Sequence, residues 1–228
     1  EPDLTNLNLR FSSKEGDVSI LFSLLPASLS SYFKDFSSTG KYVCAGYVHG
    51  KSGANRHPNI ALDFSLRDGE IASPKLYKPL ESVNFKARVE LSPTDPGHFL
   101  VQNFTANFDG EPVSLKLEVA NFDDPEVDFS MTGALPLEAG FGLFNEPEIT
   151  EGSGKIICKS LIINGKYKNM TSMSGIAGVQ TGGVVEFEKA AVKFNGTWIE
   201  AERGQVQLAD DILTLDTIEL KIKSSDLA

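Results

Sequence analysis

The feature that most constrains the fold of this chain is a strict alternation of hydrophobic and polar side chains within residues 99–137. In VSLKLEV (residues 113–119) every second side chain is a large aliphatic one, and the pattern resumes in VDFSMT (residues 127–132). A period of two is typical of a β-strand with one buried face and one solvated face. Turn-forming residues precede the first run (DGEP, residues 109–112) and separate the two (NFDDP, residues 121–125). This stretch therefore predicts consecutive antiparallel strands.

The same alternation recurs along most of the chain, and it is clearest over residues 83–91. Together with the scarcity of helical periodicity, it predicts an all-β, mainly antiparallel fold. We expect one long, strongly curved sheet folded around an apolar groove, forming a single β-rich domain over residues 1–228. Further strands are expected at residues 4–11, 18–24, 40–48, 60–66, 154–163, 184–187, 191–194, 204–208 and 212–222.

Glycine-rich segments predict where the chain reverses. Residues 14–17 (KEGD) are expected to form a hairpin turn between the first two strands, and Asp68-Gly69 is a second hairpin signal. Residues 169–183, rich in Gly, Ser, Thr and Met, are the best candidate for a mobile loop.

Helical spacing interrupts the strand pattern twice, which predicts one or two short helices as caps on the sheet. The first follows Pro26, a residue suited to the first turn of a helix. The second is expected after Leu135-Pro136. An apolar stripe on the first helix is expected to cover part of the apolar interior, through Leu25, Leu29, Phe33 and Phe36, with Tyr32 alongside.

Each helical break is followed by a G-K-x-(V/I)-C strand, which indicates an internal repeat of residues 24–52 in residues 134–167. The repeat places Cys44 and Cys158 in matching positions. A disulfide between them is allowed in an oxidising compartment. Equivalent positions of stacked repeats need not be neighbours, however, so two buried free thiols are the favoured interpretation.

Composition and motif spacing argue against several classes of function. A net charge of −10 and a pI near 4.8, with dispersed Lys and Arg, argue against a nucleic-acid partner. The three histidines, His49, His57 and His98, lack metal-ligand spacing. The chain has no nucleophile elbow, and GKS (residues 50–52) lacks the preceding glycine of a phosphate loop. We therefore expect a protein that is not an enzyme and uses no cofactor or metal.

A series of short motifs resembles the AsmA-like family, in the form common in Bacteroidetes-type bacteria. The resemblance covers residues 4–166, and residues 184–228 fit it more loosely. The motifs are a Leu-Leu-Pro helix start (residues 24–26), a strand with a basic loop (40–58), the DG pair (68–69), L-x-x-P-L (76–80), F-D-G-x-P (108–112) and T-G-x-L-x-L (132–137).

The family is related to groove-shaped, bridge-like lipid transporters. The resemblance implies a periplasmic protein held at the inner membrane by an upstream anchor, with a role in outer-membrane assembly or lipid homeostasis. The anchor is not part of this chain, and its first and last residues lie within strand patterns. We therefore expect it to be an excised segment of a longer protein.

Two functions remain open from the sequence. In the first, the apolar strand faces line a groove that holds the acyl chains of a phospholipid or another lipid. The second is a surface adhesion or glycan-binding β module, which would need a rim of exposed aromatic residues. Against both stands the interpretation that the apolar faces are the core of a β-sandwich. The candidate groove-lining residues are Val83, Phe85, Val89, Val113, Leu115, Leu117, Val119, Val127 and Phe129.

Overall fold

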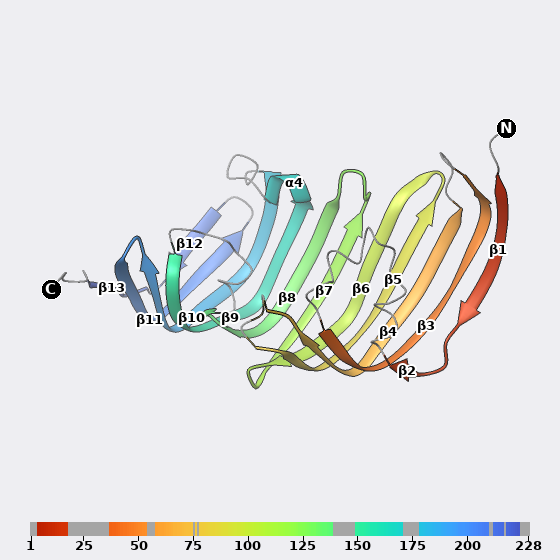
Figure 1. Cartoon of the computed structure of the whole chain (residues 1–228). Coiled ribbons are helices and arrows are strands. Elements are labelled where there is room, and N and C mark those ends of the chain that lie inside the picture. Colours follow the sequence, from red (N-terminus) through yellow and green to blue (C-terminus); the bar gives the residue numbers. More distant parts are fainter. Residues whose placement is uncertain are drawn as a thin grey trace.

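The protein forms one continuous antiparallel sheet of thirteen strands, bent into a trough (Figure 1). The strands follow one another across the sheet in chain order from β3 to β12. The computed structural model describes residues 4–17, 37–53, 58–74, 76, 78–138, 149–170, 178–209, 212–216 and 218–223.

Most of the strands are unusually long for a globular protein, where about 5–6 residues is common. A short helix, α4 (Tyr167–Met170), follows β9. The strands are β1 (Thr5–Ser12), β2 (Gly16–Asp17), β3 (Ser37–Ser52), β4 (Asn59–Ala72), β5 (Leu80–Ser92), β6 (Asp95–Phe108), β7 (Glu111–Ala120), β8 (Glu126–Pro136), β9 (Ile149–Lys166), β10 (Val179–Phe194), β11 (Thr197–Ala209), β12 (Ile212–Asp216) and β13 (Leu220–Lys223).

The two ends of the sheet depart from simple succession. β1 and β2 both pair with β3: Ser12 lies opposite Ala45, and Gly16 lies opposite Tyr42. The chain therefore continues along β3 through residues 14–17, and the hairpin turn predicted there is wrong. At the other end, β12 and β13 pair with opposite halves of β11.

β-Bulges bend the strands and produce the curvature. Asp68, with φ 47°, lies within β4 where the register to β5 shifts, so the Asp-Gly pair forms a bulge and not the predicted hairpin turn. Both features require a residue with positive φ, which is why the dipeptide alone does not distinguish them. Ser82 in β5 and Asn103 in β6 have the same left-handed backbone at register shifts.

The bulge at Asp68 has a counterpart at Lys189 in β10, and each lies opposite one copy of the predicted repeat. Gly40, with φ 115°, faces the bulge at Asp68, and Gly154, with φ 113°, faces a bulge at Lys189. A Cβ on Gly40 would lie 2.6 Å from the Gly69 Cα, and one on Gly154 would lie 2.4 Å from the Lys189 carbonyl oxygen. The buried Cys follows four residues after the glycine in each copy.

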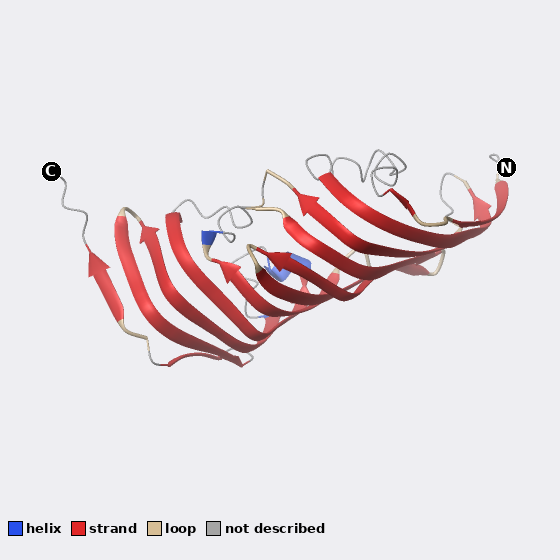
Figure 2. Ribbon diagram, turned by 90° about the horizontal axis from the view of Figure 1, so that it is seen from below, coloured by secondary structure: helices blue, strands red, loops and turns tan. Residues whose placement is uncertain are grey.

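The sheet forms a single layer among the described residues, so the β-sandwich interpretation does not hold for them. The concave side of the trough is seen in profile in Figure 2. The accessible surface of the chain is 14,947 Å², whereas a compact monomer of this mass exposes about 10,000 Å². The trough therefore does not close on itself.

The remaining sequence predictions have mixed outcomes. The first helix and its four capping residues lie outside the described residues, as does most of the second. β10 begins at Val179, inside the predicted loop, and it joins the strands predicted at residues 184–187 and 191–194 into one. The strand predicted at residues 212–222 is divided into β12 and β13.

Candidate functional site: the apolar face of the trough

The concave face of the sheet has rows of hydrophobic side chains that run from strand to strand. In an antiparallel sheet, residues directly opposite each other point to the same face. The pairing register therefore shows which side chains share the face. The central row, followed from β3 to β9, consists of Cys44, Phe64, Ala87, Val101, Leu117, Phe129 and Ile163.

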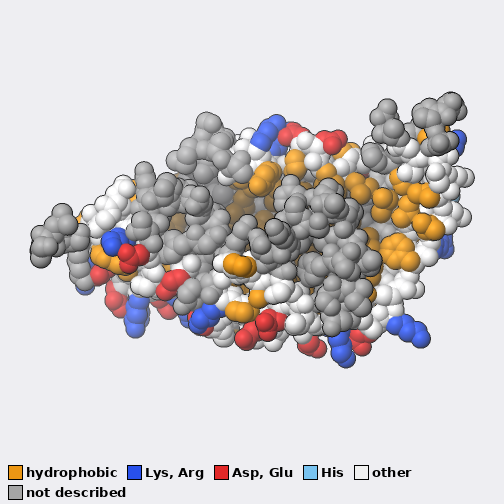
Figure 3. Space-filling model, viewed as in Figure 1, with side chains coloured by type: hydrophobic (Ala, Val, Ile, Leu, Met, Phe, Trp, Pro, Cys, Tyr) orange, Lys and Arg blue, Asp and Glu red, His pale blue; other side chains and the backbone are white. Residues whose placement is uncertain are grey.

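Similar rows lie on either side of the central row. The first contains Leu62, Val89, Phe99, Val119, Val127 and Val179, with Gly46 at its β3 end and Gly165 in β9. The second contains Tyr42, Leu66, Phe85, Phe104, Leu115, Met131 and Leu161. Hydrophobic side chains gather accordingly along the concave face in Figure 3.

Four aromatic rings form a ladder across the first part of this face. The ring centroids of Tyr42 and Phe64 are 6.2 Å apart, those of Phe64 and Phe85 are 5.5 Å apart, and those of Phe85 and Phe104 are 5.9 Å apart. Such contacts stabilise beyond the apolar area that they bury. The ladder thus links β3, β4, β5 and β6 through side-chain contacts on the concave face.

The floor of the trough contains two packed clusters. One is built around Leu66 and Val83, and the other around Phe108 and Val113. Leu80 packs against both clusters and links them. Outside these clusters, most side chains on the concave face are half-buried, so the face keeps apolar surface that the described part of the chain does not cover.

All nine predicted lining residues lie on this one face. Val83 and Val113 are buried in the clusters and contribute to the floor, whereas the other seven are half-buried. The prediction missed the aromatic residues Tyr42, Phe64 and Phe104 and the residues of β9. Phe64 could have been found from the alternation of residues 60–66, but assigning the others to this face requires knowledge of the strand pairing.

Both cysteines are free and point into the concave side. Burial raises the pKa of the Cys158 thiol; burial first, and then the charge of Asp63, raise the pKa of Cys44. They lie on β3 and β9, six strand spacings apart, which corresponds to about 29 Å. A disulfide needs Cα atoms within about 7 Å, so the interpretation as two buried free thiols is confirmed.

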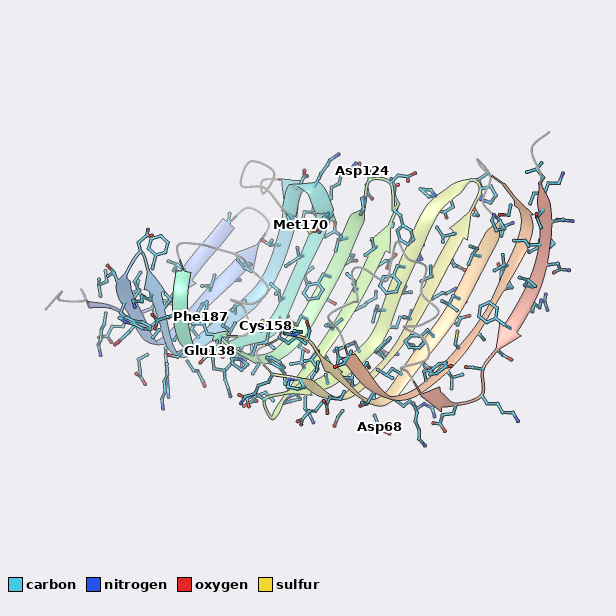
Figure 4. All side chains as sticks on the ribbon, viewed as in Figure 1. Asp68, Asp124, Glu138, Cys158, Met170 and Phe187 are labelled. Atoms are coloured by element: carbon cyan, nitrogen blue, oxygen red, sulfur yellow. The ribbon has the colours of Figure 1, made fainter. Side chains whose placement is uncertain are left out.

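Ion pairs lie on the convex face and at the rims. Arg88 donates to Asp63 (2.9 Å) across β5 and β4, and Lys159 pairs with Glu186 (3.1 Å) across β9 and β10. In Figure 4, Asp124 lies at one rim of the trough, whereas Asp68 lies at the bend of β4. Hydrogen bonds from Lys166 and Lys168 lower the pKa of Asp124.

Neither a metal centre nor a membrane-spanning helix is found in the part of the chain that the structure describes. No three His, Cys, Asp or Glu side chains there are grouped to hold a metal ion. No helix there is long and apolar enough to cross a membrane. Comparison with protein-family models, with curated proteins and with solved structures finds no match to this chain.

Proposed function

We propose that this chain is a non-enzymatic, periplasmic segment of an AsmA-like protein that holds lipid acyl chains along its concave face. In the full-length protein an upstream anchor would attach it to the inner membrane, and its role would lie in outer-membrane assembly or lipid homeostasis. The observation that supports this most is the set of apolar rows, which continue from β3 to β9 without a charged side chain.

The dimensions of the rows suit acyl chains. Seven strands spaced by about 4.8 Å give a row about 29 Å long. The hydrocarbon core of a bilayer is about 30 Å thick, so one acyl chain occupies about half that length. A row therefore has room for two acyl chains end to end, or for one chain at several positions. Transfer of their surface from water would contribute about 25 cal/mol per Å².

Headgroups would remain at the charged rims. Asp124, Lys166 and Lys168 form an ion-pair group at one rim, and Lys78 pairs with Asp109 (2.5 Å) at the other. A lipid lying with its chain on the concave face would thus keep its polar part in water. The proposal gives none of these side chains a catalytic role.

Native mass spectrometry of the purified chain tests the proposal. We expect co-purifying lipid in the wild type and its loss in Leu117→Asp, which places a carboxylate in the central row. The matched control is Val43→Asp, on the convex face of β3, which should retain the lipid. Circular dichroism confirms that both variants fold. Absence of lipid from the wild type, or equal lipid in both variants, would contradict the proposal.

Among the described residues, the exposed tyrosines do not form the aromatic rim that the adhesion alternative needs. Tyr47 lies on β3 and Tyr167 follows β9, so six strand spacings separate these two exposed rings. They cannot form one stacking platform for a sugar chain.

A further inference from the structure

Two neighbouring rows on the convex face differ from the rest of that face. In one row Lys86 lies opposite Gln102, and beyond the bulge of β6 the row continues along Lys116, Ser130 and Ile162. The other follows Asn84, Thr105, Ser114 and Thr132 and ends at Lys159 and Ser160, where β9 bulges opposite Thr132. Apart from the lysines and Ile162, every side chain in the two rows is a hydroxyl or an amide.

An open hollow of about 680 Å³ lies between these rows and crosses β6 to β9. The parts of both rows on β6 to β9 line it, together with Asn103 and the residues between the rows, Phe104, Leu115, Met131 and Leu161. Hydroxyls from Thr105, Ser114, Ser130, Thr132 and Ser160 border it, and Lys116 is the one lysine in its lining. Small side chains leave this space open. Three strand spacings give the hollow a length of about 15 Å.

All charged side chains in these two rows are positive. Lys86, Lys116 and Lys159 belong to them, and no carboxylate does, although the chain has a net charge of −10. The adjacent convex rows contain acidic side chains, such as Glu118 and Asp128 on one side. Among the ion pairs of the described residues, Lys159 pairs with Glu186, whereas none involves Lys86 or Lys116.

We propose that this hollow, which we term the convex groove, binds an anionic oligosaccharide. Lys116 inside the groove and Lys86 at its β5 end supply the countercharge for carboxylate or phosphate groups on the sugar. The row hydroxyls and the amides of Gln102 and Asn103 both donate and accept, as ring hydroxyls require. The groove is open, so a chain of sugars can lie along it. This site is separate from the concave face and does not depend on lipid binding.

Isothermal titration calorimetry of the full chain with a galacturonic-acid tetramer tests the proposal. We expect saturable binding that weakens as salt is raised. Lys116→Ala should weaken it by about tenfold, the loss expected for one charge-assisted hydrogen bond. The matched control is Arg10→Ala, an exposed residue of β1. It removes the same charge far from the groove and should change the affinity by less than about twofold.

Two further ligands test whether binding depends on both the charge and the sugar of the ligand. Maltotetraose, an uncharged tetramer, should bind far more weakly than the galacturonic-acid tetramer, and equal binding of the two would overturn the proposal. Inorganic phosphate at equal concentration should not displace the tetramer, and displacement would reduce the groove to a simple anion site. Absence of tetramer binding, or equal affinity of Lys116→Ala and wild type, would also overturn it. None of these results bears on the lipid experiment.

Discussion

The region from β3 to β6 and the region from β10 to β13 show how similar alternation in sequence can lead to different packing. In the first, strands of 13 to 16 residues bend at bulges, and the aromatic ladder joins them. Val83, in this region, is 0% exposed. In the second, the last two strands have five and four residues, and Ile222 is 70% exposed.

The difference teaches that burial here depends on strand length and curvature more than on hydrophobicity. Long bent strands bring the side chains of neighbouring strands together over the concave face, as Leu66 of β4 is packed with Tyr42 of β3 and Phe85 of β5. A short strand at the edge of a sheet has a neighbour on one side only. Its apolar side chains, such as Leu215 and Leu220, therefore stay exposed.

Truncation of one side chain in each region to alanine should give the largest contrast in the free energy of unfolding. Leu66→Ala removes a side chain that is 2% exposed and should lower the free energy of unfolding by about 2–5 kcal/mol. Ile222→Ala should change it by less than about 0.5 kcal/mol, as is usual for exposed positions. Urea denaturation measures both. Equal costs would show that the two regions do not differ as described.

The paired bulges offer a second test, because they occur once in each region. Gly40→Ala and Gly154→Ala would each force a Cβ against backbone atoms at positive φ. Each should cost about 1–3 kcal/mol in unfolding free energy. Gly110→Ala is the control, since its φ is 81° but nothing lies within 4 Å of the new Cβ. Thermal melts in which Gly110→Ala is the most destabilised variant would contradict this account of the bulges.

Thiol reactivity tests the packing of the β3–β6 region against that of β9, where the second cysteine lies. The raised pKa of Cys44 and of Cys158 leaves little thiolate near neutral pH, and both side chains are buried. Iodoacetamide at pH 7.5 should modify both slowly in the native protein and rapidly in urea. Peptide mass spectrometry distinguishes the two sites. Rapid native alkylation of Cys44 would show that the β3–β6 region opens more readily than its packing indicates.

The smallest effect is expected at the rim. Lys166 and Lys168 lower the pKa of Asp124 below its ordinary value of 3.8, so the carboxylate stabilises the fold above that value. This contribution is lost as the pH falls through the lowered pKa. Asp124→Asn should therefore reduce the melting temperature slightly at pH 7, and its difference from the wild type should shrink as the pH is lowered below 3.8. A difference that stays the same as the pH falls would mean that another interaction is responsible.

The sequence predicted the strands and one face of the central region well, because alternation there is uninterrupted. Leu115, Leu117 and Val119 lie on the predicted face, and Asp109 and Gly110 form the predicted turn with φ of 54° and 81°. This turn joins β6 and β7 directly, as a two-residue hairpin requires.

Other features could not be predicted because a bulge inserts a residue and shifts the alternation. The break at Lys189 therefore resembles the end of a strand, although β10 continues through it. The Asp68-Gly69 pair was predicted to be a hairpin turn for the same reason, although it forms a bulge within β4. The convex groove was missed because its rows come from strands whose register only the folded sheet defines, and a Ser or Thr on a solvated face is unremarkable in sequence.

Methyl NMR with a spin-labelled stearic acid most directly tests the central claim that the concave face holds acyl chains. The nitroxide broadens methyl signals near it, and both faces of the sheet provide methyl groups. We expect broadening of Leu117, Val119 and Val127 on the concave face, with Val43 and Ile162 on the convex face unaffected. Equal broadening on both faces, or none at all, would contradict the account.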